Sequence, residues 1–174
     1  MNVSLRPICE RDTDNIISWR NNPDVLRNFI IQTPLTEEMH RSWLETRVKT
    51  GEVAQFIIHA NDESMDIGTV FLRDIDLNHK KAEFGIFIGA CGKRGKGYGT
   101  KAAKLILDYA FYTLKLNRVM LRVFEENAAA IKSYERVGFK KEGIFREDVM
   151  IDGKGVNVLY MSILKREWIS DHYE

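Results

Sequence analysis

The sequence contains few cysteines, few prolines and almost no net charge, and each shortage excludes a class of protein. Its 174 residues include three prolines and two cysteines, Cys9 and Cys91, which form no CxxC or Cys/His spacing. A disulfide framework and a structural zinc site are therefore not indicated, and we expect no metal ion. The 26 basic side chains nearly balance the 25 acidic ones, so the net charge of +1 lacks the excess typical of nucleic-acid-binding proteins.

Long apolar runs are also missing. Charged residues interrupt every long apolar stretch, and the first ten residues contain no apolar signal segment. We therefore expect no secretion signal, no membrane-spanning helix and no membrane partner, and we predict a cytoplasmic protein. With 44% apolar and 29% charged residues, the chain predicts one globular domain over residues 1–174.

The order of the expected elements predicts one mixed α/β sheet with helices packed on it. The clearest helix follows Thr100, where small and apolar residues recur at helical spacing. Along the chain we expect a strand at 3–8, helices from 11–14 to 21 and from 36 to 51, strands at 53–60, 67–72 and 82–89, the helix after 100, a strand at 118–124, a helix at 128–137, and strands at 144–150 and 156–164.

A glycine-rich basic segment, Lys93–Thr100, lies between a predicted strand and the start of the clearest helix. Unpaired N–H groups at a helix start attract anions, and glycines at 95, 97 and 99 allow a close backbone approach. The segment matches neither a P-loop nor a dinucleotide-binding loop. It predicts a phosphate-binding site, with a flexible basic turn that only caps the helix as the alternative.

The spacing Arg94-x-x-Gly97-x-Gly99 resembles the signature of the GNAT superfamily of acetyl-coenzyme A dependent N-acetyltransferases. The residues 82–89 resemble the family's fourth strand, and 127–139 resemble its Asn, Ala, Tyr and Gly-Phe segment. The chain is most similar to the branch of ribosomal-protein N-terminal, polyamine and nucleotide-sugar amine acetyltransferases. The resemblance implies a mostly antiparallel central sheet with helices on both faces, and fourth and fifth strands that splay apart.

The resemblance also implies how acetyl-coenzyme A binds. Its pyrophosphate would rest on the backbone amides of the loop, and its pantetheine arm would pair along the fourth strand, with the Ile88 N–H facing the thioester oxygen. Asn127 would hold the arm, although a plain helix cap is the alternative role. The implied cofactor-binding residues are Ile86, Phe87, Ile88, Arg94, Gly95, Lys96, Gly97, Tyr98, Gly99, Thr100, Asn127 and Ala130.

Two side chains are candidates for proton transfer. By resemblance, Tyr134 is the acid that protonates the departing thiolate, and a tyrosine that only packs in the core is the alternative. Strand alternation places Glu83 on the face of strand 82–89 opposite Phe84. It is the candidate base for the acceptor amine; the alternative is a carboxylate that orients the acceptor or pairs with an arginine.

The resemblance, together with these residues, implies direct transfer of an acetyl group from acetyl-coenzyme A to a primary amine of a small molecule or a peptide N-terminus. A non-catalytic acyl-coenzyme A sensor is the alternative, and a homodimer remains open. The acceptor signals conflict, because Trp19–Asp24 resembles nucleotide-sugar amine acetyltransferases, whereas Ala82–Phe84 resembles polyamine acetyltransferases. Carboxylates that could bind a polycation occur at Glu37, Glu38 and Glu45, although carboxylates on a predicted helix ordinarily form a solvated face.

Overall fold

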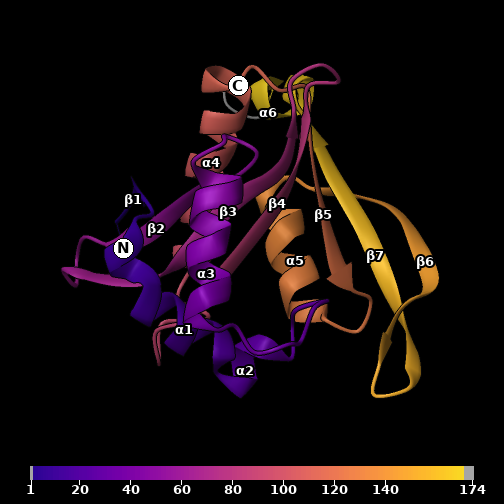
Figure 1. Cartoon of the computed structure of the whole chain (residues 1–174). Helices are drawn as coiled ribbons and strands as arrows, with labels where there is room; N and C mark the ends of the chain where they lie inside the picture. The colour runs from indigo at the N-terminus through magenta and orange to yellow at the C-terminus, as the bar shows by residue number, and fades with distance from the viewer. Residues whose placement is uncertain (1, 171–174) are drawn as a thin grey trace.

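The computed structural model describes residues 2–170 and shows a single sheet in the order β1-β2-β3-β4-β5-β7-β6 (Figure 1). All neighbouring strands are antiparallel except β4 and β5, which are parallel. This confirms the mixed, mostly antiparallel sheet. The strands are β1 (Val3–Pro7), β2 (Ala54–Ala60), β3 (Met65–Asp76), β4 (Lys81–Ile88), β5 (Arg118–Phe124), β6 (Lys140–Ile151) and β7 (Lys154–Leu164).

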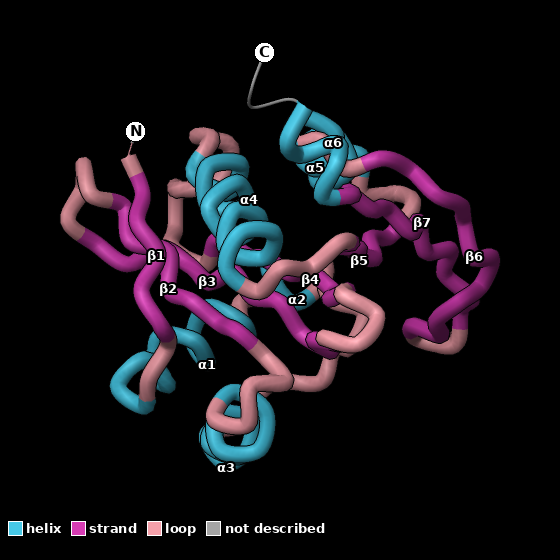
Figure 2. The backbone as a smooth tube through the Cα atoms, turned by 90° about the horizontal axis from the view of Figure 1, so that it is seen from above, coloured by secondary structure: helices cyan, strands magenta, loops and turns pink. Residues whose placement is uncertain are grey.

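Helices cover both faces of the sheet, as expected. Helices α4, α5 and α6 lie on one side, and α1 and α3 lie on the other (Figure 2). The helices are α1 (Thr13–Asn21), α2 (Pro23–Leu26), α3 (Glu37–Trp43), α4 (Tyr98–Asp108), α5 (Ala128–Val137) and α6 (Lys165–Ser170). The helix expected over 36–51 is α3, which continues as a wider turn over Leu44–Val48 where the Lys49 N–H bonds to the Leu44 carbonyl.

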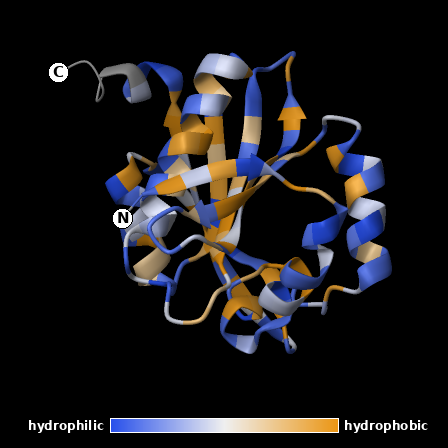
Figure 3. Ribbon diagram, turned by 90° about the vertical axis from the view of Figure 1, so that its left-hand side faces the viewer, coloured by the Kyte–Doolittle hydropathy of each residue, from blue (hydrophilic) through white to orange (hydrophobic). Residues whose placement is uncertain are grey.

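The two faces bury separate apolar clusters. The larger one lies between the sheet and α4, with Phe84, Ile106 and Phe111 among its members. The smaller one lies under α1 and the turn after α3, and contains Ile16 and Leu44. Figure 3 shows the apolar colouring concentrated along the strands, while the helices alternate apolar and polar segments. Within residues 2–170, no helix is both long and apolar enough to cross a membrane.

The feature of the sheet that matters most for the site is the separation of β4 from β5. The two strands are paired over three residues only, ending at Glu83 opposite Met120. Beyond that point β4 runs on to Ile88, and β5 keeps only its pairing with β7, which extends from Arg118 to Phe124. This confirms the splay implied by the family resemblance, and it leaves a wedge in the middle of the sheet.

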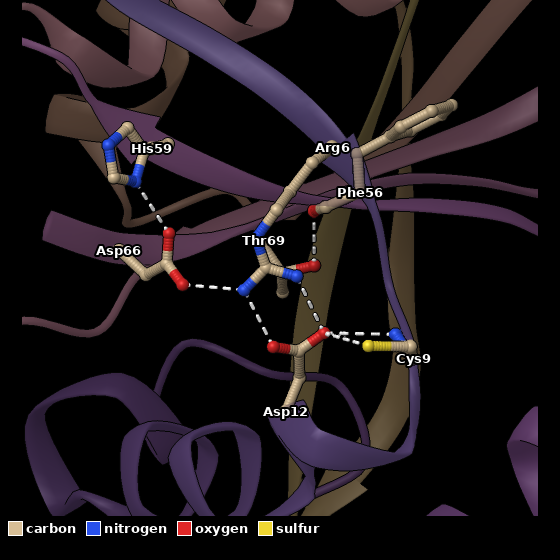
Figure 4. Close-up of polar contacts among 7 residues, drawn as sticks. All are labelled: Arg6, Cys9, Asp12, Phe56, His59, Asp66 and Thr69. Atoms are coloured by element: carbon tan, nitrogen blue, oxygen red, sulfur yellow. Dashed lines mark hydrogen bonds and ion pairs between the residues drawn. The ribbon is translucent and has the colours of Figure 1, made fainter.

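An ion-pair network fixes the edge strand β1 to the start of α1 (Figure 4). The Arg6 guanidinium donates to both carboxylate oxygens of Asp12 at 2.9 and 2.7 Å, and to Asp66 of β3 at 2.5 Å. His59 completes the chain, since its Nδ1 lies 2.8 Å from Asp66. Burial alone would raise the pKa of Asp12, but the hydrogen bonds from Arg6 and from Cys9 outweigh it and hold that pKa below its ordinary value.

Replacing Asp12 by Asn should lower the free energy of unfolding at pH 7 by about 1–2 kcal/mol, because the variant loses a charge-assisted pair. The lowered pKa of Asp12 means that its contribution is present above the unfolded-state pKa of about 3.9 and is lost as pH falls through the folded-state value. Thermal unfolding at pH 7 and pH 3 checks both points. The matched control is Asp74→Asn. Asp74 is 60% exposed and pairs with Arg47, so this substitution should change the free energy of unfolding little. A gap between wild type and Asp12→Asn that is equally large at pH 3 contradicts this account.

Candidate active site

The glycine-rich loop has the open backbone that an anion site needs. Gly97 is the N-cap of α4 with φ +82°, and Gly95 has φ +77°. A Cβ added at either position would meet no atom within 4 Å. These glycines are therefore needed for their left-handed backbone conformation rather than for lack of space, and the surface above them is open. Helix α4 begins at Tyr98, three residues earlier than expected, so the N–H groups of residues 98–100 lie in its first turn, where they have no intrahelical acceptor. The loop therefore fits a pyrophosphate.

The side chains of this loop point in different directions, some into the protein and some into solvent. Tyr98 is 2% exposed, and its hydroxyl donates to Glu63 at 2.6 Å, so only its backbone is available to a ligand at the loop. Lys93 pairs with the same Glu63. Arg94 is exposed and donates to the backbone carbonyl of Asp24 in α2 at 3.1 Å, and Lys96 is exposed as well. Arg94 and Lys96 are thus the loop cations available to a phosphate.

Backbone N–H and C=O groups of β4 point into the wedge, where the described part of the chain offers them no partner strand. The Phe87 carbonyl faces β3, since a Cβ on Gly68 would lie 2.2 Å from it, and the Gly89 N–H bonds to the Ile67 carbonyl at 2.9 Å. Peptide groups alternate along a strand, so the N–H and C=O of Ile88 point the other way, toward β5. The Ile86 N–H shares that direction, whereas the Phe87 backbone serves β3. Because the described pairing of β4 with β5 ends at Glu83, these groups can bind an extended molecule.

Helix α5 forms one wall of the wedge. Asn127 is its N-cap, with its side-chain oxygen accepting the Ala130 N–H at 3.1 Å and its amide nitrogen donating to Asn28 at 3.1 Å. Two turns later, the Tyr134 ring packs edge-to-face on Phe84, with ring centroids 6.0 Å apart. Burial raises the pKa of Tyr134 to about 12. The phenol therefore stays protonated at neutral pH, as an acid catalyst must.

Glu83 lies on the opposite face of β4, between two arginines. Its carboxylate accepts from Arg73 at 2.5 Å and from Arg122 at 3.1 and 3.3 Å. It is 13% exposed, and each arginine is 27% exposed. Pairing with arginine was one of the alternatives for this residue, and the structure shows that pairing at the mouth of the wedge.

The family model described as an acetyltransferase (GNAT) domain matches residues 2–140. The chain belongs to the GNAT family. It is 31% identical to the spermidine N(1)-acetyltransferase of Escherichia coli K12 over 98% of this chain and 90% of that protein. Identity to the Vibrio cholerae spermidine N(1)-acetyltransferase is 34%, over 97% of this chain and 96% of that protein.

Two solved structures of the Vibrio cholerae spermidine N-acetyltransferase are close to this GNAT chain. The crystal structure with CoA and spermine superposes with a TM-score of 0.89 at 28% identity, covering 96% of this chain and 98% of that one. A dodecameric form superposes with a TM-score of 0.83 at 28% identity, covering 99% and 98%. The GNAT chain is thus an acetyl-CoA-dependent N-acetyltransferase that transfers an acetyl group to an amine, and the alternative of a non-catalytic sensor is set aside.

Sequence reasoning missed which residues are the polar partners of Glu83. Arg73 is the register partner of Glu83 across β3 and β4, and Arg122 reaches Glu83 from β5. Arg122 also interacts with Tyr160, whose hydroxyl donates to Asp148 at 3.2 Å. The resulting chain of contacts crosses five strands. No local pattern could have revealed it, because each contact depends on strand pairing rather than on sequence spacing.

Proposed function

We propose that acetyl transfer takes place directly between acetyl-CoA and the acceptor amine in the wedge between β4 and β5. The observation that carries the proposal is the set of unpaired backbone groups of β4 in the wedge, at Ile86 and Ile88, with Tyr134 near one face and Glu83 on the other. When bound, acetyl-CoA supplies an acetyl thioester. The loop around Gly97 would hold its pyrophosphate, and Asn127, already linked to Asn28, would hold its pantetheine arm.

The residues of the wedge divide the chemistry. An N–H of β4 stabilises the negative charge that develops on the carbonyl oxygen. Both the Ile88 and the Ile86 N–H have the required direction; Ile86 lies nearer to Phe84, which contacts Tyr134. The neutral amine attacks the thioester carbon, and as the C–S bond breaks Tyr134 donates its proton to the departing sulfur. The amine nitrogen loses a proton to water as the new C–N bond forms, and a proton from water restores the Tyr134 phenol.

Of the two roles considered for Glu83, its contacts favour orientation of the acceptor. Two guanidinium groups compensate the carboxylate charge and fix its position, which suits a group that holds an amine by hydrogen bonding. Strand rise places Glu83 about 10 Å from Ile86 and about 16 Å from Ile88, so Glu83 would hold a part of the acceptor remote from the reacting amine, and a proton transfer to it from that amine would need a water chain. The base role remains a prediction that kinetics can separate from orientation.

Replacing Glu83 by Gln should raise the acceptor KM about 10-fold and change kcat by less than about 3-fold, because Gln keeps the shape but loses the charge that orients the amine. Steady-state kinetics across pH 6–9 measures both constants. A base would give another pattern: kcat would fall about 100-fold at neutral pH, and the loss would shrink as pH rises and the amine deprotonates by itself. Glu52→Gln, at an exposed partner of Arg47, is the control.

The acceptor class is tested by thiol release from acetyl-CoA with a panel of amines. The relatives favour polyamines, because the Vibrio cholerae structure contains spermine. Aminosugar nucleotides, amino acids and peptides beginning with Ala or Ser complete the panel. No thiol release with any amine, together with no binding of acetyl-CoA, would overturn the proposed function.

We further propose that the chain works as a homo-oligomer in the cytoplasm. A dodecamer of the Vibrio cholerae relative and the long outer strand β6 support self-association. Its large apolar side chains Ile144, Phe145 and Met150 are 46–66% exposed. Light scattering at two protein concentrations measures the assembly, and a monomer at both would contradict it.

A further inference from the structure

The acceptor face, by which we mean the side of the sheet that carries Glu83 and Phe87, contains a cation that has no acidic partner among residues 2–170. Arg20, near the end of α1, is half-buried, and burial lowers its pKa to about 10. Its Nη2 donates to the Ile31 carbonyl at 2.5 Å, while its Nη1 is buried without a hydrogen-bond partner. Within residues 2–170 no carboxylate forms an ion pair with it. A partly desolvated charge of this kind is costly unless an anion compensates it.

The position of Arg20 is fixed by aromatic contacts with the acceptor side of β4. Its guanidinium carbon lies 3.6 Å from the centroid of the Phe29 ring, and that ring packs on Phe87 with centroids 5.4 Å apart. Phe87 shares its strand face with Glu83, opposite the face of Phe84 and Tyr134. The preceding residue, Trp19, lies directly over Gly89. Arg20 is therefore on the α1 side of the sheet, whereas the glycine-rich loop leads into α4 on the other side (Figure 2).

The carboxylates nearby are already engaged. Glu83 is shared by Arg73 and Arg122, and Asp148 accepts from Tyr160. Three glutamates on α3 and the turn that follows it were considered for a polycation. Two of them form ion pairs with residues four positions further along the chain: Glu37 with Arg41 and Glu45 with Lys49. Arg73 and Arg122 are thus compensated by carboxylates, whereas Arg20 is not compensated by any described residue, and this uncompensated guanidinium favours a negatively charged ligand over a polycation.

We propose that the acceptor amine carries an anionic group, a carboxylate or a phosphate, and that Arg20 is the residue that binds it. The inference rests on the proposed function and adds the charge of the acceptor to it. The Arg20 Nη groups would donate charge-assisted hydrogen bonds to the anion, and Phe29 would keep the guanidinium plane in place. The amine end of the same molecule would lie beside Ile86 and Ile88, where the acetyl group is transferred. A polycation would instead meet like charge on this face.

The first test compares acceptors that differ in charge alone. Thiol release is measured for alanine against alaninamide, for glucosamine 6-phosphate against glucosamine, and for spermidine. In at least one pair the anionic member should show a kcat/KM about 10-fold or more above its neutral partner and above spermidine. The two pairs separate a carboxylate from a phosphate requirement. Preference for spermidine or for the neutral members overturns the proposal while leaving acetyl transfer intact.

The second test uses Arg20→Gln. For the anionic acceptor, KM should rise about 10-fold with kcat little changed, because the lost contact forms equally in the bound and reacting states. The neutral partner should be unaffected. The matched control is Arg41→Gln, which alters a 54%-exposed arginine on α3. Equal losses for the charged and neutral acceptors, or a weaker affinity for acetyl-CoA, would show that Arg20 serves the fold or the cofactor instead.

A binding measurement decides the matter even if none of these amines is acetylated. Calorimetry of inorganic pyrophosphate with protein saturated with CoA probes the Arg20 site while the loop around Gly97 is filled. We expect binding that Arg20→Gln weakens about 10-fold and Arg41→Gln does not. Absent binding, or binding of spermine in its place, overturns the proposal. Failure of CoA itself to bind would instead count against the proposed function.

Discussion

Tyr134→Phe should turn over about 100-fold more slowly than the wild type while binding acetyl-CoA with the same affinity. The substitution removes one hydroxyl and leaves the ring contacts with Phe84 and Phe139 in place. General acid catalysis typically contributes a factor of 10² or more, so the loss falls on kcat. The pKa of about 12 keeps the wild-type phenol protonated across the neutral range, so the ratio of the two rates should stay constant from pH 6 to 9.

Stopped-flow thiol release measures this effect, and calorimetry measures acetyl-CoA affinity. Tyr109→Phe is the matched control, since its ring packs edge-to-face on Phe56 at 5.2 Å and it takes no part in the wedge. Its turnover should equal that of the wild type. If Tyr134→Phe also retains normal turnover, Tyr134 is a packing residue and another group supplies the proton.

Gly97→Val should weaken acetyl-CoA binding about 100-fold. The N-cap conformation at φ +82° is costly for any residue with a Cβ, and more so for a β-branched one, so the first turn of α4 must shift. The N–H groups of residues 98–100 then no longer converge on one anion. Losing one or two charge-assisted hydrogen bonds of about 1.5–3 kcal/mol each accounts for the size of the effect.

Gly153→Val provides the matched control for strain. Gly153 has φ +76° and lies in the turn between β6 and β7, and a Cβ added there would also meet no atom within 4 Å. Both variants should lose thermal stability to a similar extent, whereas only Gly97→Val should lose affinity in calorimetry. Equal affinities in the two variants would remove the loop from the cofactor site.

Local patterns in the sequence predicted the parts of the structure that depend on neighbouring residues. The helical spacing after Thr100 predicted α4, and the helix expected at 128–137 is α5, which ends at Gly138 with φ +114°. The early start of α4 follows from Gly97, whose left-handed conformation caps the helix directly. Strands β3 and β6 extend beyond their expected bounds, because their pairing with neighbouring strands resumes after the bulges at 73/76 and 145/149.

The parts that depend on cross-strand register could not be predicted. The alternation of β4 placed Glu83 on the correct face, but its arginine partners come from β3 and β5. Arg20 stood within a recognised segment, yet nothing in that segment indicated its contact with Phe29. The side chain of Tyr98 likewise turns into the core, although the sequence predicted that its loop binds an anion. Each outcome is decided by which segments meet in space.

The wedge between β4 and β5 gives the protein two free strand edges in the interior of a sheet. Free edges on the outside of a sheet invite pairing with other chains, and proteins protect them with charges, prolines or bulges. Here the protection comes from position: Tyr134 packs over β4 on one face, and Phe29 packs over it on the other. A second polypeptide strand therefore has less access to these edges than to the outer edge of a sheet. The wedge can thus leave backbone groups of β4 without a strand partner at a smaller risk of aggregation.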